Sequence, residues 1–284
     1  MVTNGDVMSV NEGAPAFTAV DHAMMAQALR LAERGAYTTK PNPMVGCVIA
    51  QGDEVVGEGW HQRKGGPHAE VFALQAAGKR ARGATAYVTL EPCAHHGRTP
   101  PCCDALIEAR LARVVMALVD PFPQVAGQGA ARLRAAGITV EEGLLAKEAR
   151  ELNIGFFSRV QRGRPWLRLK AAVSLDGRTA LENGVSQWIT GAAARTDGHA
   201  FRRRAGAVLT GVGTVLDDDP RLDVRLVETA KQPLRVVVDS RLETPPTAKL
   251  LAPPGAVLAC FADTATYLEP GHLWRGGGCG DEAG

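Results

Sequence analysis

Net charge, aromatic side chains and long apolar runs are all scarce in this sequence of 284 residues. Its 32 basic and 30 acidic residues leave a formal charge of +2, and aromatic residues make up 5% of it. This nearly balanced charge gives no indication of the basic surface with which proteins bind nucleic acids or anionic membranes. Uncharged stretches such as 41–52 and 250–262 fall short of the ~18 apolar residues of a spanning helix. The start of the sequence lacks the basic residues of a secretory signal. We therefore expect a cytoplasmic protein with no nucleic-acid and no membrane partner.

Cysteine is also sparse, and the six cysteines are unevenly distributed. A chain without an export signal is expected to keep its thiols reduced, which argues against a disulfide framework. Cys93, Cys102 and Cys103 nevertheless lie close together in the sequence, with two histidines between them. Thiols clustered beside histidines in such a chain indicate metal binding or catalysis.

Length and composition predict two α/β domains. Hydrophobic residues make up 45% of the sequence and charged residues 22%, which allows a core in each of two domains. The basic, turn-prone run Arg159–Pro165 divides the chain into residues 18–160 and 165–284, unless it is an ordinary surface loop. Strands alternate with helices in both parts, which favours a parallel or mixed sheet covered on both faces. The predicted strands are 45–50, a short one near Val55, 84–90, 113–119, 138–140, 167–173, 207–209, 234–239 and 257–261, and the predicted helices are one from the Thr18 cap to Gly35, 68–77, 102–110, 129–136, 144–152 and 193–204.

A candidate metal site lies in the segments His68-Ala69-Glu70, Glu91-Pro92-Cys93 and Pro100-Pro101-Cys102. An imidazole and two thiolates are zinc ligands, and three protein ligands leave a fourth position open, as in catalytic sites. Zinc in such a site lowers the pKa of bound water to ~7 and supplies hydroxide at neutral pH. Glu70 is suited to carry a proton from that water to a departing nitrogen. The pattern is typical of zinc deaminases, although these have two residues between the cysteines where this chain has eight.

Other interpretations of this cluster stay open. A closed structural zinc site needs a fourth protein ligand, which Cys103, His95 or His96 would supply. Cys103 could also replace Cys102, but Cys102 directly follows two prolines and is better placed at a helix start, where thiolates are stabilised. A cluster without metal is the last alternative. The open catalytic site is the interpretation that we favour.

Motifs around these ligands resemble one enzyme family. Residues 41–46, 59–61, 68–70 and 89–102 are similar to the deaminase half of the bifunctional riboflavin biosynthesis deaminase/reductases, and the match covers roughly residues 18–160. The long segment between the two cysteines is that family's own form of the zinc motif. The resemblance implies a cytidine-deaminase-like, three-layer αβα domain. It also implies that Glu70 is the catalytic glutamate and that a Zn²⁺ ion is bound by His68, Cys93 and Cys102.

The resemblance also implies a reaction and a substrate pocket. The substrate is 2,5-diamino-6-ribosylamino-4(3H)-pyrimidinone 5′-phosphate; hydroxide attacks C2 and ammonia leaves, giving a uracil. The pocket takes the positions of Asn42, His61, His95 and Arg98. Asparagine offers a donor and an acceptor to a base edge, and arginine suits a phosphate. Ordinary structural interpretations remain: a turn between prolines for Asn42, a solvated loop for Arg98 and a hydrogen-bonded, partly buried histidine for His61.

The second part resembles the reductase half of the same family. Residues 170–180, 186–190, 213–220 and 239–240 carry this resemblance in the family's order. It implies a dihydrofolate-reductase-like domain that reduces the ribosyl group to ribityl by hydride transfer from NADPH to C1′. By position, NADPH would contact Ala172, Trp188, Thr214, Asp218 and Ser240, and the substrate would contact Ser186, Arg202, Leu222 and Arg225. The two arginines suit a 5′-phosphate through charge-assisted bonds, unless they are solvated surface residues.

The reductase resemblance departs from the family pattern after about Ala262. The family continues with further strands and helices, including a Glu-x-Gly-Pro-type turn that meets the cofactor phosphates, and this sequence has no such segment. The glycine cluster 276–280 is not followed by a helix, so it lacks the geometry of a phosphate-binding loop. We expect an incomplete reductase domain with an exposed sheet edge, an intact deaminase and an impaired reductase.

Two other classes of function are open to the sequence. A polynucleotide-editing zinc deaminase needs a basic face with aromatic residues that stack an extruded base, which this composition does not favour. A non-enzymatic, zinc-stabilised binding protein would keep the metal without depending on Glu70. We prefer an enzyme that acts on a small phosphorylated pyrimidine, and the family pattern implies a homo-oligomer.

Overall fold

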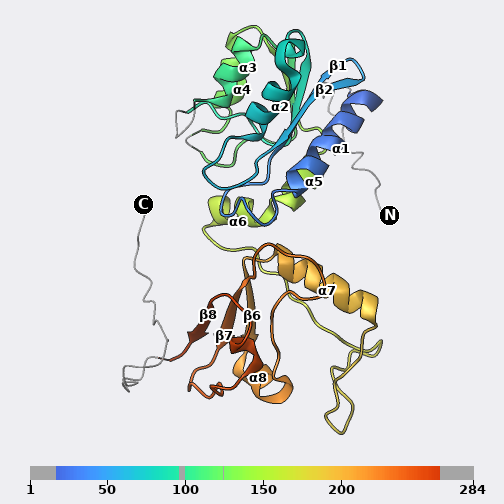
Figure 1. Cartoon of the computed structure of the whole chain (residues 1–284), viewed down its shortest axis with the longest axis vertical. Helices are drawn as coiled ribbons and strands as arrows, with labels where there is room; N and C mark the ends of the chain where they lie inside the picture. The colour runs from blue at the N-terminus through green and yellow to red at the C-terminus, as the bar shows by residue number, and fades with distance from the viewer. Residues whose placement is uncertain (1–16, 96–99, 124, 263–284) are drawn as a thin grey trace, which may run out of the picture. The chain divides into compact units, whose positions relative to one another are not determined.

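The computed structural model describes residues 17–95, 100–123 and 125–262, and Figure 1 shows the course of the chain. The chain divides into two compact units between Leu167 and Arg168. Each unit combines helices with a sheet, so the predicted α/β class is confirmed. In these ranges no helix has the length and apolar character needed to cross a membrane.

A mixed sheet forms the centre of the first unit, with the strand order β2-β1-β3-β4-β5. β1 pairs antiparallel with β2 and β3, whereas β3, β4 and β5 run parallel. Gly52 adopts a φ of +63° in the turn between β1 and β2, a conformation that glycine reaches without strain. The strands are β1 (Gly46–Gln51), β2 (Glu54–Trp60), β3 (Thr85–Val88), β4 (Arg113–Met116) and β5 (Thr139–Glu142).

Helices cover both faces of this sheet. Successive strand residues point to opposite faces, so neighbours in sequence enter different cores. Val48 and Tyr87 pack in a cluster with α1 and α5, while Ile49 and Val88 pack in a second cluster with α2, α3 and α4. The predicted three-layer αβα arrangement is therefore confirmed (Figure 1). The helices are α1 (Ala19–Glu33), α2 (Ala69–Ala77), η1 (Gly78–Ala81), α3 (Cys102–Glu108), α4 (Gln128–Ala135), α5 (Ala146–Leu152) and α6 (Ile154–Arg162).

Helix α2 lies against the backbone of β2. A Cβ atom at Gly57 would come within 2.2 Å of the Ala73 carbonyl oxygen, and one at Gly59 would come equally close to the Ala69 carbonyl oxygen. Only glycine fits under the helix at these points. This close packing fixes the N-terminus of α2, which begins directly after His68.

The second unit contains a smaller parallel sheet with the order β6-β7-β8 in its described residues. Its core cluster consists of Val215, Val237, Ala248 and Leu250, with a few partly buried neighbours. The elements are α7 (Ala192–Arg204), β6 (Ala207–Gly211), α8 (Val212–Asp218), β7 (Leu234–Val238), η2 (Lys249–Leu251) and β8 (Val257–Cys260).

Two local predictions near the division between the units are wrong. Residues 167–173 form no strand, and Leu167 and Leu169 are 83% and 94% exposed. A strand needs a neighbour for its backbone hydrogen bonds, and within the described ranges no strand lies alongside this segment. Helix α6 ends only at Arg162, so the first part of the run Arg159–Pro165 is helical rather than a turn.

The glycine cluster 276–280 lies outside the described residues.

Candidate active site

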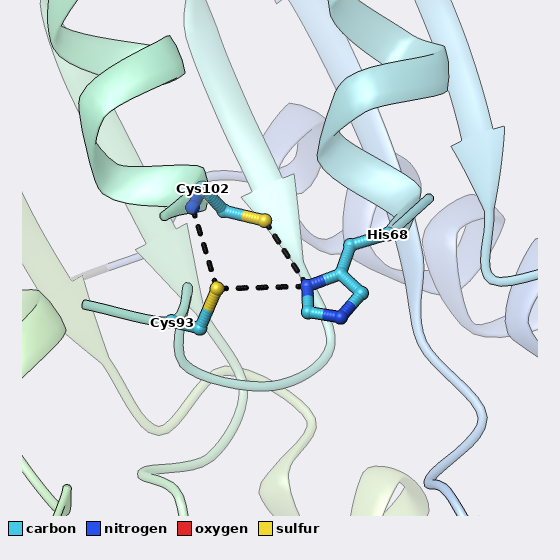
Figure 2. Close-up of side chains that lie close together, drawn as sticks. All are labelled: His68, Cys93 and Cys102. Atoms are coloured by element: carbon cyan, nitrogen blue, oxygen red, sulfur yellow. Dashed lines mark hydrogen bonds between the residues drawn. The ribbon is translucent and has the colours of Figure 1, made fainter. Parts of the chain in front are cut away.

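Three side chains from separate elements meet beyond the carboxyl end of β3 (Figure 2). His68 directly precedes α2, Cys93 lies in the loop after β3, and Cys102 is the first residue of α3. The His68 Nδ1 atom lies 3.2 Å from the Cys102 sulfur and 3.5 Å from the Cys93 sulfur. The three potential ligand atoms lie within 4.8 Å of one another. The structure thus brings the predicted ligand set within reach of a single ion.

Hydrogen bonds at this cluster shift the pKa values of the two thiols in opposite directions. The backbone N–H of Cys102, at the start of α3, donates to the Cys93 sulfur over 3.3 Å. Hydrogen bonding from the Cys102 thiol lowers the pKa of Cys93 to about 4, with further help from His68 and against the effect of burial. Donation to Cys93 and burial raise the pKa of Cys102. One imidazole nitrogen and two adjacent sulfurs fit the preference of Zn²⁺, which binds thiolates.

Glu70 lies beside these groups in the first turn of α2, and only 3% of it is exposed. Its Oε2 atom is buried and forms no hydrogen bond within the described residues. Burial raises the pKa of this carboxyl, and the charge of His68 opposes the rise. A buried carboxyl with a free oxygen and a raised pKa is suited to general acid–base chemistry.

His61 directly follows β2, and its ring lies edge-on to His68 with 5.6 Å between the centroids. Its Nδ1 atom lies 3.1 Å from the Pro67 carbonyl oxygen, which can only accept, so Nδ1 carries the proton in this contact. Burial lowers the pKa of the ring and favours the neutral form, in which Nε2 is an acceptor. Nε2 is buried and lacks a partner in the part of the chain that the structure describes.

The other predicted substrate residues occupy loops. Asn42 is half-buried in the loop before β1, where its backbone N–H donates to the Thr39 carbonyl over 2.8 Å. His95 is exposed, two residues after Cys93. Arg98 and the alternative ligand His96 lie outside the described residues.

Cys103 is directed away from the cluster. Its thiol donates to the Pro92 carbonyl over 3.3 Å, and burial raises its pKa to about 12. The group of potential ligand atoms within the described ranges contains Cys102 and not Cys103. The geometry therefore favours Cys102 as the second sulfur.

The buried residue Glu91 has a role that sequence reasoning missed. Its Oε2 atom accepts the backbone N–H groups of Asp120 at 3.0 Å and Gly127 at 2.9 Å, and its Oε1 atom accepts that of Ala130 at 3.1 Å. The carboxylate thereby ties the loop after β4 and the start of α4 to the segment that carries Cys93. Its place in the motif Thr-Leu-Glu-Pro-Cys was the available signal, but the partners are distant in sequence.

In the second unit, part of the predicted NADPH set lies at the carboxyl edge of the sheet. Because β6 and β7 are parallel, Thr214 in α8 and Ser240 after β7 follow neighbouring strand ends. Asp218, the last residue of α8, accepts a hydrogen bond from Ser186 Oγ over 3.3 Å. Ligands of open α/β sheets bind at this edge.

The two remaining predicted NADPH residues lie in the segment that precedes α7. Trp188 is exposed, with the Arg195 guanidinium 4.6 Å from its ring centroid. Ala172 is half-buried in the segment that forms no strand. No described contact ties either residue to the sheet edge.

Three of the four predicted reductase substrate residues lie around Asp223, whereas Ser186 contacts Asp218. Arg202 donates to the Asp223 carbonyl oxygen over 3.1 Å, and Arg225 donates to its carboxylate over 2.8 Å. Leu222 is buried next to them. Burial acts to raise the pKa of Asp223, but the arginines at 221 and 225 lower it overall. The result is a cluster of cations with one carboxylate, which suits an anionic group.

Comparison with known proteins connects both units to one family. The family model described as the cytidine and deoxycytidylate deaminase zinc-binding region matches residues 18–118, and the RibD C-terminal domain model matches residues 165–266. The riboflavin biosynthesis protein RibD of Escherichia coli is 54% identical over 247 residues, which cover 83% of this chain and 67% of that protein. This chain belongs to the RibD family. RibD of Buchnera aphidicola is 43% identical over 263 residues, covering 88% of this chain and 71% of that protein.

Solved RibD structures share the fold. RibD of Acinetobacter baumannii superimposes with a TM-score of 0.77 at 52% identity, covering 85% of this chain and 69% of that one. The Thermotoga maritima deaminase/reductase gives a TM-score of 0.81 at 39% identity, covering 88% and 72%. The chain spans about two thirds of the length of its RibD relatives, and less of some, such as 65% of the Aquifex aeolicus protein.

RibD proteins join a zinc-dependent deaminase to a reductase that uses NADPH, and this chain contains both domains. It is therefore a deaminase fused to an oxidoreductase domain of riboflavin biosynthesis, with Zn²⁺ and NADPH as cofactors. These findings do not favour the polynucleotide-editing enzyme or the non-enzymatic binding protein.

Proposed function

We propose that the first unit uses His68, Cys93 and Cys102 to bind zinc and deaminates 2,5-diamino-6-ribosylamino-4(3H)-pyrimidinone 5′-phosphate at C2. The observation that carries this proposal is the cluster of one nitrogen and two sulfurs with the buried carboxyl of Glu70 beside it. Three ligands leave one coordination position for a reacting group, which distinguishes a catalytic site from a structural one.

Glu70 is the proton carrier of the proposed reaction. When bound, zinc supplies a hydroxide nucleophile at neutral pH. Glu70 accepts the proton that the attacking water gives up and delivers it to the amino nitrogen at C2. The C–O bond forms first by addition to C2, and the C–N bond then breaks so that the nitrogen leaves as ammonia. The second water proton ends on a ring nitrogen, so the atoms balance.

Residues around the ligands are proposed to bind the nucleotide. His61 Nε2 is a buried acceptor beside the ligand His68 and would receive an N–H of the pyrimidine. Asn42 would contact the base edge with its amide, Arg98 would bind the phosphate, and His95 would belong to the same pocket. This arrangement favours a small phosphorylated pyrimidine over a nucleic acid or a membrane. We propose a cytoplasmic homo-oligomer, which light scattering on the purified protein would test.

For the second unit we propose that NADPH contacts Ala172, Trp188, Thr214, Asp218 and Ser240, and that the substrate contacts Ser186, Arg202, Leu222 and Arg225. The carboxyl edge of the sheet supports the assignment of Thr214 and Ser240, and the contacts around Asp223 support that of Arg202 and Arg225. NADPH oxidation with the deaminated nucleotide tests this assignment.

Ammonia release from the diaminopyrimidine nucleotide tests the deaminase proposal. Glu70→Gln should keep about one zinc per chain and lose turnover by ~10²–10⁴-fold, because the amide cannot carry the proton. Glu148→Gln changes an exposed carboxyl of α5 and serves as the control. Zinc-loaded protein without ammonia release would contradict the proposed reaction, and full turnover by Glu70→Gln would contradict the proton-carrier role.

A further inference from the structure

Asn153, at the junction of α5 and α6, forms a two-point contact with a distant loop. Its Oδ1 atom accepts the backbone N–H of Met44 over 2.8 Å, and its Nδ2 group donates to the Met44 carbonyl over 2.8 Å. The side chain thus satisfies both backbone polar groups of one residue, as a neighbouring strand would. Only 4% of Asn153 is exposed, so these bonds are protected from water.

The contacted loop carries Asn42 of the proposed substrate pocket. Met44 lies between Pro43 and Val45, and the prolines at positions 41 and 43 have no backbone N–H to hold the loop. The Val45 carbonyl accepts the backbone N–H of His61 over 2.9 Å. Asn153 therefore fixes Met44, which lies two residues after Asn42 and directly before Val45, whose carbonyl contacts His61.

The backbone around Asn153 is itself well held. Its N–H donates to the Ala149 carbonyl over 3.3 Å, and its carbonyl accepts the Phe157 N–H over 3.0 Å. Phe156 of α6 also packs edge-on against Phe122 of the loop after β4, with 5.9 Å between the centroids. The start of α6 thus contacts both the loop before β1 and the loop after β4.

We propose that Asn153 is a positioning residue of the deaminase: it holds the loop of residues 41–45 in the conformation that presents Asn42 to the pyrimidine. This inference rests on the proposed function, since it needs Asn42 to contact the substrate. It assigns α6, at the end of the first unit, a part in substrate recognition. Asn153 itself acts only through the Met44 backbone.

Steady-state ammonia release by Asn153→Ala tests the role. Because the loop binds substrate and transition state alike, KM should rise roughly tenfold while kcat and zinc content stay near the original values. Gln161→Ala removes an exposed amide from the same helix and should change neither constant. If Asn153→Ala loses zinc or unfolds, Asn153→Asp decides, since it keeps the acceptor for the Met44 N–H and should show a smaller rise in KM.

Amide hydrogen exchange of a peptide spanning residues 41–46 provides a readout without activity. Exchange should be faster in Asn153→Ala than in the original protein and unchanged in Gln161→Ala. Unaltered KM together with unaltered exchange would overturn the inference. If the original protein releases no ammonia, the proposed function fails, and the exchange measurement alone decides whether Asn153 holds the loop.

Discussion

The two units differ most in how their sheets are covered. In the first, β1, β3 and β4 lie between two apolar clusters, one on each face. In the second, the described residues up to 262 form one small cluster around β7, and apolar residues such as Leu169, Leu175 and Leu209 are exposed. The first unit therefore holds its reactive groups on a rigid frame. Within its described residues, the second has much less buried apolar surface to stabilise the sheet edge at which we propose a ligand site.

Hydrogen exchange should show the largest contrast between the units. We expect amides of β1, β3 and β4 to open only with extensive unfolding, whereas those of β6 and β8 lie over a small core in the described residues. We expect protection factors on the order of 100-fold lower in the second sheet. Exchange with mass spectrometry on the full chain measures both sheets in one sample. Equal protection would show that the second unit is stabilised as well as the first, despite its exposed apolar residues.

Local motifs predicted that His68, Cys93 and Cys102 come together in the first unit, because these residues lie where strands and loops enter helices. His68, Glu70 and Cys102 each occupy the start of a helix, and short spacing in the sequence is enough to place them there. The contacts of Glu91 and Asn153, which hold the loops around the site, were not predicted, because the partners of both residues are distant in sequence.

At residues 167–173 the error is of the opposite kind, because a strand was predicted that did not form. The sequence predicted a strand here, but the segment's own residues cannot supply the neighbour that a strand needs. Leu167 and Leu169 are exposed in the absence of such a neighbour within the described residues. In the first unit, by contrast, every predicted strand has a partner in the sheet, and all of them form.

Removing the Glu91 carboxylate should weaken the first unit substantially. Glu91→Ala leaves three backbone N–H groups without their acceptor, so we expect a loss of about 3–5 kcal/mol in the free energy of unfolding. Glu91→Gln keeps one acceptor oxygen and should lose less. Urea denaturation with near-ultraviolet circular dichroism measures the change, and Glu108→Ala, at an exposed position of α3, is the matched control. Similar midpoints for Glu91→Ala and the control would show that the loop after β4 is held by other contacts.

Asp21 should make the stability of the first unit depend on acid. Burial acts to raise the pKa of this carboxyl, but Arg113, the Thr18 backbone N–H and the Tyr87 hydroxyl together hold it well below the usual range. A depressed pKa in the folded state contributes stability that is present at neutral pH and lost as the pH falls below the unfolded value of about 3.9.

Asp21→Asn should therefore lower the free energy of unfolding by about 1–3 kcal/mol at pH 7, because the amide keeps the shape but not the charge that faces Arg113. The difference from the original protein should narrow as the pH approaches 3, where the original carboxylate begins to lose its advantage. Asp53→Asn, in the exposed turn between β1 and β2, should show no such trend. Urea denaturation at several pH values distinguishes the two. A difference that stays constant down to pH 3 would mean that the hydrogen bonds of Asp21, rather than its charge, stabilise the unit.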